Sequence, residues 1–348
     1  MGLGQIRTTD EQHSSCSTSR TLPRCMFLDA AQAESWLETH QLNPLAIISF
    51  SGRVPGLLHR PVIRLDLPEL TAPPQLEVWG TPDPVHTYRD KGFSASATDN
   101  VLFGSMTIDE LPGQSLDTLT ELAYRRMLSH LQSLDYPYLW RVWNYFPHIN
   151  GLDEGLERYQ RFCRGRHRAL EDMLPDFPHS LPAGTAVGTR SGPLHIQFMA
   201  GSLPAVHLGN PRQIHAYEYP QDYGPRSPSF ARATLCRSDA GSHLYISGTA
   251  SVVGHASRHQ GLPAEQTEET INNLNVLMAH AEERARQQIT GAQSQACYKV
   301  YIRHAADLAA IQKTLHEFSL PESHIIYLQG DLCRQELLVE IEGVVPSP

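Results

Sequence analysis

A succession of strand, helix, strand, helix and two further strands occurs twice along this chain of 348 residues. Helical segments are indicated by apolar residues three and four apart, as at Leu274, Leu277, Met278 and Ala281, and strands by short apolar runs. In the first copy the segments are 101–109, 115–134, 138–146, 155–173, 185–189 and 194–201. In the second copy they are 243–252, 264–285, 298–305, 307–318, 324–332 and 336–344.

Two copies of this kind predict an α/β protein made of two related units packed side by side. When the two closing strands are superimposed, Gln197 of the first copy falls on Glu340 of the second. One copy therefore holds an amide where the other holds an acid, as divergence of a duplicated unit would produce. We expect the active site in the cleft between the units, with the acid supplied by the second copy.

The duplication divides the chain into an N-terminal α/β unit over 27–200 and a C-terminal unit over 201–348. Residues 1–26 are rich in Ser, Thr and Arg and are predicted to form a disordered extension. The segment 209–235 combines prolines, tyrosines and arginines without a helical period. A loop of that length inside a compact domain is usually functional. The alternative is a surface strap whose tyrosines cover the join between the units.

Composition excludes several classes of protein. A net charge of −9 and a pI near 6.0 argue against a nucleic-acid binder. No apolar run is long enough to span a membrane, and the polar start lacks the apolar core of an export signal, so we expect a cytoplasmic protein. The cysteines form no CxxC pair and indicate reduced thiols, and neither a metal site nor a cofactor is predicted. These cysteines are Cys16, Cys25, Cys163, Cys236, Cys297 and Cys333.

The most informative single residue is Glu340, which interrupts an apolar strand between Val339 and Ile341. A carboxyl group in apolar surroundings has a raised pKa, because its charged form loses hydration. The alternative is that Glu340 faces solvent from an edge strand. Glu342 would then do the same, since residues two apart share a face of a strand.

Five long motifs resemble the chorismatase family, whose members remove the enolpyruvyl group of chorismate and release pyruvate. The resemblance runs from about residue 100 to 345, and the C-terminal part alone also resembles the YjgF-like imine deaminase fold. The motifs are "YLWRVWNYFPHING", "GLERYQRFCRGRH", "YEYPQDYGPRSPSFARA", "YISGTASVVGHASRH" and "DLCRQELLVEIEG". Within the family, the chain is most similar to bacterial enzymes that make 3-hydroxybenzoate, often with 4-hydroxybenzoate, for aryl-polyene pigments and quinones.

The resemblance implies two catalytic residues. Glu340 would deliver a proton to the terminal methylene carbon of the enol ether, which requires a carboxylic acid that stays protonated near neutral pH. Cys333 matches a cysteine associated in the family with 3-hydroxybenzoate formation, whereas a lone cysteine near a strand more often only fills space.

Chorismate carries two carboxylates on a small apolar ring, so its site needs cationic or hydroxyl donors and an apolar floor. Arg303 is the first candidate for a carboxylate fork; its alternative is a surface arginine. Tyr159 and Arg166 share a helix face, which solvent exposure would explain equally well. The expected substrate-contacting residues are Arg303, Tyr219, Tyr223, Arg226, Gln197, Ala250, Tyr159 and Arg166.

Two rival functions follow from the same sequence. A YjgF-like imine deaminase would need only the C-terminal unit, and a non-catalytic small-acid-binding protein could keep the fold without the chemistry. The preferred hypothesis is a cofactor-free enzyme whose only partner is chorismate. Its oligomeric state is left open between monomer and trimer.

Overall fold

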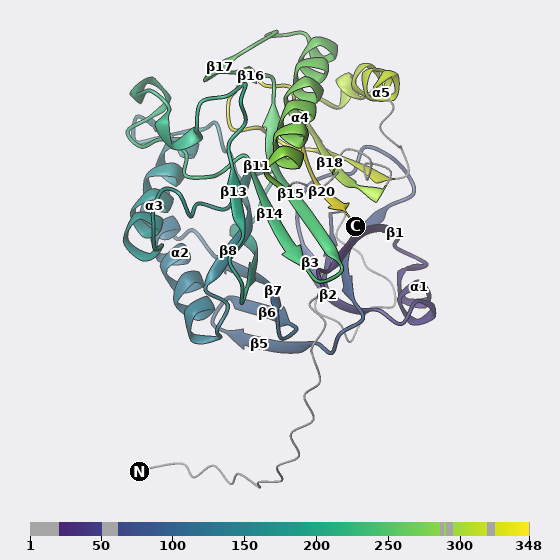
Figure 1. Cartoon of the computed structure of the whole chain (residues 1–348). Coiled ribbons are helices and arrows are strands. Elements are labelled where there is room, and N and C mark those ends of the chain that lie inside the picture. The colour runs from purple at the N-terminus through teal and green to yellow at the C-terminus, as the bar shows by residue number, and fades with distance from the viewer. Residues whose placement is uncertain (1–20, 51–61, 286–288, 290–294, 319–323, 348) are drawn as a thin grey trace, which may run out of the picture.

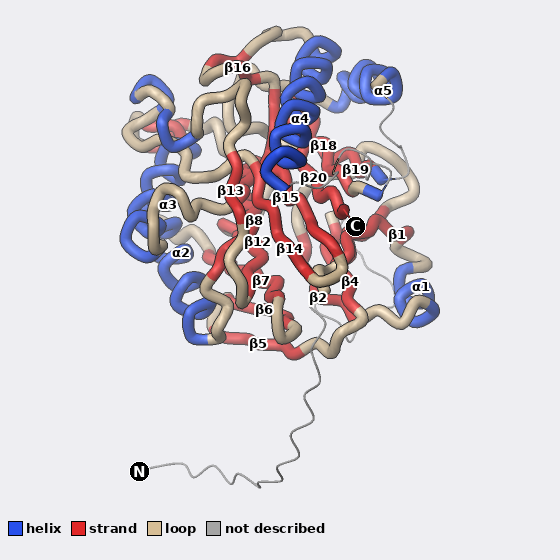
Figure 2. Tube along the Cα trace, in the orientation of Figure 1, coloured by secondary structure: helices blue, strands red, loops and turns tan. Residues whose placement is uncertain are grey.

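The computed structural model describes residues 21–50, 62–285, 289, 295–318 and 324–347. In that part of the chain the strands gather in the centre of the molecule and the helices lie around them (Figures 1 and 2). None of the described helices is long and apolar enough to cross a bilayer.

The first predicted unit is a six-stranded sheet with two helices on one face. The strands lie in the order β11-β8-β12-β7-β6-β5, with β8 and β11 parallel and all other neighbours antiparallel. Its elements are β5 (His86–Asp90), β6 (Phe93–Ala97), β7 (Val101–Ile108), α2 (Leu116–Ser133), β8 (Tyr138–Pro147), the hairpin β9 (Leu152–Asp153) and β10 (Leu156–Glu157), α3 (Arg158–Met173), β11 (Ala183–Thr189) and β12 (Leu194–Gly201).

The second unit repeats this arrangement strand for strand. Its sheet order is β19-β18-β20-β15-β14-β13, and β18 and β19 form its parallel pair. Its elements are β13 (Val206–Leu208), the 3-10 turns η1 (Ala216–Glu218) and η2 (Gln221–Tyr223), β14 (Ala233–Ser238), β15 (Gly241–Ala250), the hairpin β16 (Val252–Val253) and β17 (Ala256–Ser257), α4 (Pro263–Ala285), β18 (Cys297–Ile302), η4 (Ala305–Asp307), α5 (Leu308–Glu317), β19 (Ile325–Gln329) and β20 (Val339–Ser347). The predicted duplication is confirmed.

A third, smaller copy precedes these two, within the residues that were predicted to belong to the first unit. Residues 24–81 form the small N-terminal sheet in the order β3-β2-β4-β1, with β2 and β3 parallel. Its elements are β1 (Arg24–Asp29), α1 (Ala33–Thr39), β2 (Asn43–Ser49), β3 (Val62–Arg64) and β4 (Gln75–Thr81). In all three sheets the third, second, fourth and first strands of the copy are neighbours in that order, so the chain holds three related sheets.

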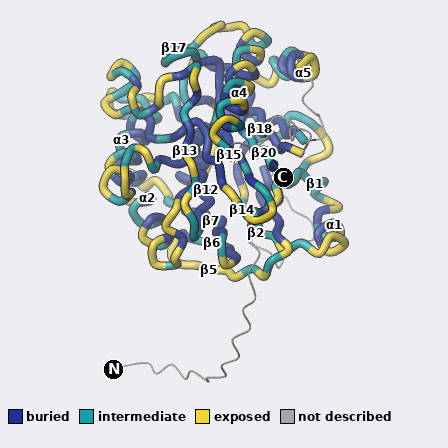
Figure 3. The backbone as a smooth tube through the Cα atoms, viewed as in Figure 1, coloured by how far each residue is buried: buried dark blue, intermediate teal, exposed yellow. Residues whose placement is uncertain are grey.

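The three sheets share one core. Each sheet packs helices on its outer side, α2 and α3 for the first unit, α4 and α5 for the second and α1 for the small sheet. Their inner faces meet in a common cluster, seen as the dark centre of Figure 3. Trp79 of β4 contacts both units there, with ring centroids 6.0 Å from Trp143 of β8 and 6.2 Å from Tyr245 of β15.

Two predicted boundaries differ from the structure. Of the predicted extension, residues 1–20 lie outside the described residues, whereas residues 24–26 already belong to β1, because Met26 packs against the core under α1. The closing strand, predicted over 336–344, begins at Val339. The chain before it, 332–337, is a loop, in which the carbonyls of Leu332, Arg334 and Leu337 accept hydrogen bonds from the Arg303 side chain.

Candidate active site

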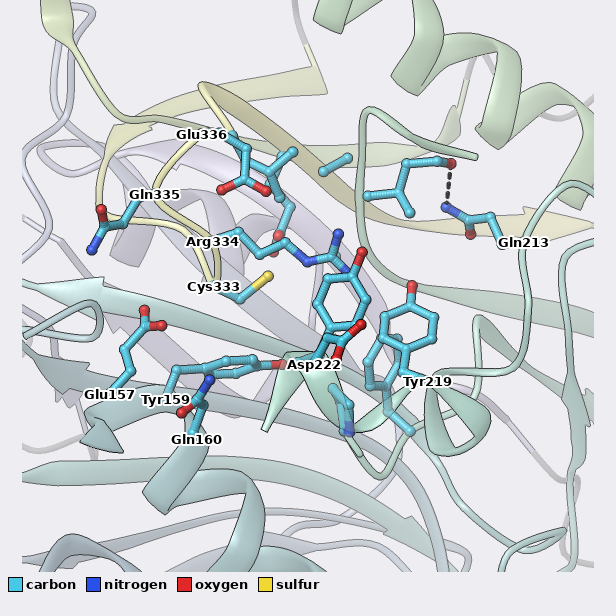
Figure 4. A pocket seen from close by; sticks show the side chains of 18 of the residues that line it. Glu157, Tyr159, Gln160, Gln213, Tyr219, Asp222, Cys333, Arg334, Gln335 and Glu336 are labelled. Atoms are coloured by element: carbon cyan, nitrogen blue, oxygen red, sulfur yellow. Dashed lines mark hydrogen bonds between the residues drawn. The ribbon is translucent and has the colours of Figure 1, made fainter. Parts of the chain in front are cut away.

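A cavity of about 310 Å³ lies where the start of α3 in the first unit faces β15 and β20 of the second. We call it the Glu340 pocket. Figure 4 shows Cys333 and Tyr159 pointing toward its middle from one side, with Tyr219 opposite. Its lining comprises Glu157, Tyr159, Gln160, Gln213, Tyr219, Asp222, Tyr223, Pro228, Phe230, Arg232, Gly248, Ala250, Val252, Cys333, Arg334, Gln335, Glu336, Leu337 and Glu340.

Glu340 lies on the inner face of β20 and is only 4% exposed. Its backbone pairs with Ala250 on one side and Tyr301 on the other, so the strand is central and the side chain cannot turn to solvent. Its carboxyl group has no hydrogen-bond or ion-pair partner among the described residues. Burial, followed by the charge of Glu342, raises the pKa of Glu340 to about 8. The group is therefore mostly protonated at neutral pH.

Glu342 shares that face of β20 but has the opposite character. Arg141 and Lys299 approach its carboxylate to 2.6 and 2.8 Å. Burial opposes its charge, but these two cations hold the pKa of Glu342 below its ordinary value. Glu342 also accepts hydrogen bonds from Trp143 and Tyr301. One strand face thus carries a protonated acid beside a fixed anion, and neither glutamate points outward.

A glycine makes room for the protonated acid. The ladder between β15 and β20 shifts register between Ile246 and Thr249, and Gly248 lies in that irregular stretch. A β-carbon at position 248 would lie 2.1 Å from Oε1 of Glu340, which is closer than real contacts allow. The Gly248 amide donates to Thr185 Oγ1 at 2.9 Å, and Arg141 donates to the same oxygen. This chain of contacts connects the position of Glu340 to that of Arg141.

Cys333 enters the pocket from the loop between β19 and β20. Burial and then the neighbouring Glu340 raise the pKa of its thiol to about 12, so the thiol stays neutral. Such a group can transfer or share a proton, but it is not a ready nucleophile. Ala250, the backbone partner of Glu340, lines the same wall and leaves space above the acid.

The Tyr- and Pro-rich segment supplies two of the predicted aromatic residues. The rings of Tyr219 and Tyr223 lie 5.4 Å apart, and Tyr223 shares a hydrogen bond with His255. Arg334 stacks on both rings, 4.1 Å from that of Tyr223. Arg232 donates to the Tyr219 hydroxyl at 2.6 Å. The segment is therefore part of the pocket wall.

Two arginines in this wall were not anticipated. Arg232 and Arg334 line the pocket, and neither has a carboxylate partner among the described residues. The Nε atom of Arg232 is buried without a hydrogen-bond partner. Arg232 is buried and Arg334 is half-buried. Guanidinium groups in such surroundings without a carboxylate partner fit an anionic ligand. The sequence offered one signal for these two arginines: both lie inside motifs that resemble the chorismatase family, the same motifs that contain the predicted site residues Arg226 and Cys333.

Four predicted contact residues, Arg303, Arg226, Gln197 and Arg166, lie outside the pocket lining. Arg303 bonds to the carbonyls of Leu337, Leu332 and Arg334 and pairs with Asp331 at 2.7 Å, so it fastens the loop that carries Cys333. Arg226 is exposed on the outer part of its segment. Gln197 is buried on β12 between its register partners Ser105 and Trp143, in the first sheet rather than beside β20.

The two predicted helix residues differ in position. Tyr159 lines the pocket, and burial raises the pKa of its hydroxyl well above the ordinary value. Arg166 is 3% exposed, stacks on Phe162 and has Nε and one terminal nitrogen without partners. It is not in the lining, and the side-chain positions contradict the alternative of a solvated helix face for both residues.

Comparison with known proteins decides the family. Residues 77–200 match the family model described as chorismatase FkbO/Hyg5-like, N-terminal. A 3-hydroxybenzoate synthase of Streptomyces hygroscopicus is 35% identical over 315 residues, covering 87% of this chain and 92% of that protein. The chain belongs to the chorismatase family.

Further members agree with this assignment. A protein named chorismatase, also from Streptomyces hygroscopicus, is 35% identical over 274 residues, covering 77% of this chain and 78% of that one. A crystal structure of a chorismatase superimposes with a TM-score of 0.82 and 31% identity, covering 94% of this chain and all of the other. Among the described residues of this family member, no group of His, Cys, Asp or Glu could hold a metal ion.

Proposed function

We propose that this protein converts chorismate into 3-hydroxybenzoate and pyruvate, with Glu340 as the proton donor. The observation that carries the proposal is a buried carboxyl group with a pKa of about 8, facing a cavity whose wall holds two arginines without a carboxylate partner among the described residues. Relatives named 3-hydroxybenzoate synthase and chorismatase support the substrate and the main product.

Chorismate is a dianion with an apolar ring. In our proposal Arg232 and Arg334 bind its carboxylates, because both guanidinium groups line the pocket and lack carboxylate partners in the described chain. Tyr159, Tyr219 and Tyr223 provide aromatic surface and hydroxyl donors beside them. Arg166, behind the Tyr159 side of the pocket, adds positive charge that is unpaired among the described residues.

The chemical step begins with proton transfer from Glu340 to the terminal methylene carbon of the enolpyruvyl group. The resulting oxocarbenium ion weakens the ether bond to the ring, and the new carboxylate of Glu340 stabilises that positive charge. The ether oxygen leaves with pyruvate, and aromatisation of the ring releases a proton that can restore Glu340. The atoms of chorismate then divide between hydroxybenzoate and pyruvate, and no water is consumed.

The product depends on the fate of the ring hydroxyl next to the ether carbon. Direct loss of pyruvate followed by aromatisation leaves that hydroxyl in place and gives 4-hydroxybenzoate. Formation of 3-hydroxybenzoate requires its oxygen to bridge to the neighbouring carbon first. We assign to Cys333 the proton movement that accompanies this shift, because its neutral thiol lines the same wall as Glu340. We propose 4-hydroxybenzoate as the minor product, with Ala250 limiting how the ring sits.

We further propose a cytoplasmic location and a role for the products in pigment or quinone synthesis. The location is supported by the described cysteines, Cys25, Cys163, Cys236, Cys297 and Cys333, all of which are free. The role follows from the resemblance to bacterial enzymes that supply hydroxybenzoates for aryl-polyene pigments and quinones.

The deciding experiment is incubation of the purified protein with chorismate, followed by chromatographic identification of the products. We expect pyruvate in an amount equal to the sum of 3-hydroxybenzoate, the main product, and 4-hydroxybenzoate. Glu340→Gln keeps the shape of the side chain but cannot donate a proton as an acid, so kcat should fall by about 10²–10⁴-fold. Glu283→Gln, at a side chain 81% exposed, is the matched control and should retain full activity.

Three outcomes would count against the proposal. Unchanged chorismate would exclude the reaction and leave the small-acid-binding alternative. Hydrolysis of an imine substrate in the absence of chorismate turnover would favour the deaminase. Full turnover by Glu340→Gln would remove Glu340 from the mechanism.

A further inference from the structure

A second cavity, of about 620 Å³, lies on the first unit and is separate from the Glu340 pocket. We call it the Thr189 pocket. Its walls come from the small N-terminal sheet and from the connection between β11 and β12. Its lining comprises Phe50, Arg64, Leu65, Asp66, Pro68, Glu69, Thr71, Ala72, Pro74, Tyr145, Thr189, Arg190, Ser191, Gly192, Pro193 and His195.

The two pockets occupy corresponding places in related units. The Glu340 pocket is built from the loop before the closing strand β20, the first residues of that strand, and the unit preceding it in the chain. The Thr189 pocket is built from the loop before the closing strand β12, the start of that strand, and the sheet preceding it. The duplication has therefore produced two cavities from one architecture, with different side chains in each.

Two residues that line the Thr189 pocket carry buried polar atoms without partners in the described part of the chain. Thr189 and His195 are each 8% exposed, and neither Thr189 Oγ1 nor His195 Nε2 has a hydrogen-bond partner among the described residues. Burial lowers the pKa of His195 to about 4, so its imidazole is neutral at pH 7. A buried polar atom without a partner is costly, and a ligand that supplies the missing hydrogen bonds removes that cost.

The remaining lining combines apolar surface with positive charge at the edge. Phe50, Leu65 and Tyr145 are buried and supply the apolar part. Arg64 and Arg190 are exposed, and neither has an ion-pair partner among the described residues. The acidic groups of the lining already accept hydrogen bonds, Asp66 from Ser191 at 2.5 Å and Glu69 from the Gln75 amide at 2.8 Å.

We propose that the Thr189 pocket binds a small aromatic carboxylate that carries a ring hydroxyl. The hydroxyl group meets Thr189 and His195, the ring lies on the apolar side chains, and the carboxylate reaches Arg64 or Arg190 at the edge. A hydroxyl can both donate to the neutral imidazole and accept from the threonine, which is why it fits this pair. The inference does not depend on the proposed function.

The test uses fluorine NMR with 3-fluoro-5-hydroxybenzoate as the probe and the full-length protein. Two bound resonances are expected, one from each pocket. Thr189→Val keeps the side-chain size but removes the hydroxyl, and should weaken one of the two sites by about fivefold or more. Thr189→Ser, the matched control, retains a hydroxyl and should keep both sites. Ala250→Leu fills the Glu340 pocket and should remove the other resonance only.

A single bound resonance that Ala250→Leu abolishes and Thr189→Val leaves unchanged would overturn the proposal. So would the absence of any bound resonance, or equal binding by the Val and Ser variants. Chorismate turnover, measured on the same samples, reports separately on the proposed function. If no sample, the wild type included, turned over chorismate while the resonance from the Thr189 pocket remained, only the proposed function would be contradicted.

Discussion

Glu340 and Glu342 lie two residues apart on one face of β20, yet their protonation differs. Both are buried, and desolvation acts to raise both pKa values, but only the pKa of Glu340 ends above its ordinary value. The difference comes from partners, because Arg141 and Lys299 contact Glu342 directly, whereas Glu340 faces the cavity. Two carboxyl groups whose pKa values are driven apart in this way are typical of acid–base sites.

A pH dependence of activity follows from the pKa of Glu340. The reaction needs the protonated acid, so kcat/KM should be level below about pH 7 and fall tenfold per unit above about pH 8. The measurement is a pH profile of chorismate consumption with the wild-type protein. A profile that rises through pH 8 would show that the ionised form is active and would contradict the assigned role.

The same group influences stability with a definite sign. Its folded pKa is raised from 4.5 to about 8, so between these values the folded protein holds a proton that the unfolded chain has lost. The contribution of Glu340 to the free energy of unfolding is therefore fully present below about pH 4.5. It falls as pH rises toward about 8. Glu340→Gln should flatten this part of the stability curve in urea unfolding.

At the level of strands and loops, the irregular part of β15 determines where the acid can sit. Gly248→Ala would bring a methyl group onto the Glu340 carboxyl and displace it. We expect kcat to fall by at least about tenfold, since a misplaced catalytic group loses much of its effect. The variant should remain folded, as checked by circular dichroism.

Gly80→Ala is the control for that substitution. Its nearest neighbour would be the flexible end of Met26, at 3.1 Å, in the small N-terminal sheet. Activity should be close to that of the wild type. If Gly248→Ala were as active as Gly80→Ala, the close approach of position 248 to the Glu340 carboxyl group would not matter for catalysis.

The loop before β20 depends on Arg303, which the sequence suggested as a substrate ligand. Arg303→Ala removes bonds to three carbonyls of the loop and an ion pair to Asp331. The free energy of unfolding should fall by about 2–4 kcal/mol, and turnover should fall with it. Arg168→Ala, at a side chain 49% exposed, should change stability little. An unchanged stability with a raised KM would support the original substrate role instead.

The main helices and central strands of the two larger units could be predicted because their periodicity is local and repeated, whereas the strands β5, β6, β13 and β14 were not among the predicted segments. The small N-terminal sheet could not, because it has one short helix, α1, and strands whose pairing is set by contacts far along the chain. Among the site residues, Glu340 was recognisable as a carboxyl inside an apolar strand. Arg232 and Arg334 were not, because their place in the pocket wall, without a carboxylate partner among the described residues, is a property of the folded arrangement.

In the molecule as a whole, a buried set of charges connects the three sheets. Lys299 of β18 pairs with Glu342 of β20 at 2.8 Å and with Glu77 of β4 at 2.9 Å, and Arg141 of β8 pairs with the same Glu342. The two cations and two anions balance, so this set adds no net charge to the core that the three sheets share.

Lys299→Met should be strongly destabilising, because it leaves Glu77 without its cation and Glu342 with only one. We expect a loss of about 3–5 kcal/mol in the free energy of unfolding. The double variant Lys299→Met/Glu77→Gln also removes the carboxylate that has lost its cation, and should recover part of that loss. Lys313→Met, on a side chain 79% exposed, is the control. A single variant as stable as the control would show that the charges are not coupled to folding.

Joining three sheets of the same strand order in one polypeptide has an evolutionary consequence. In a ring of identical subunits, every mutation appears at each junction at once. Here the codons for Gln197 and Glu340 can change independently. Selection can therefore keep a reactive acid at the junction between two sheets, while another junction acquires a different specificity or serves only to stabilise the fold.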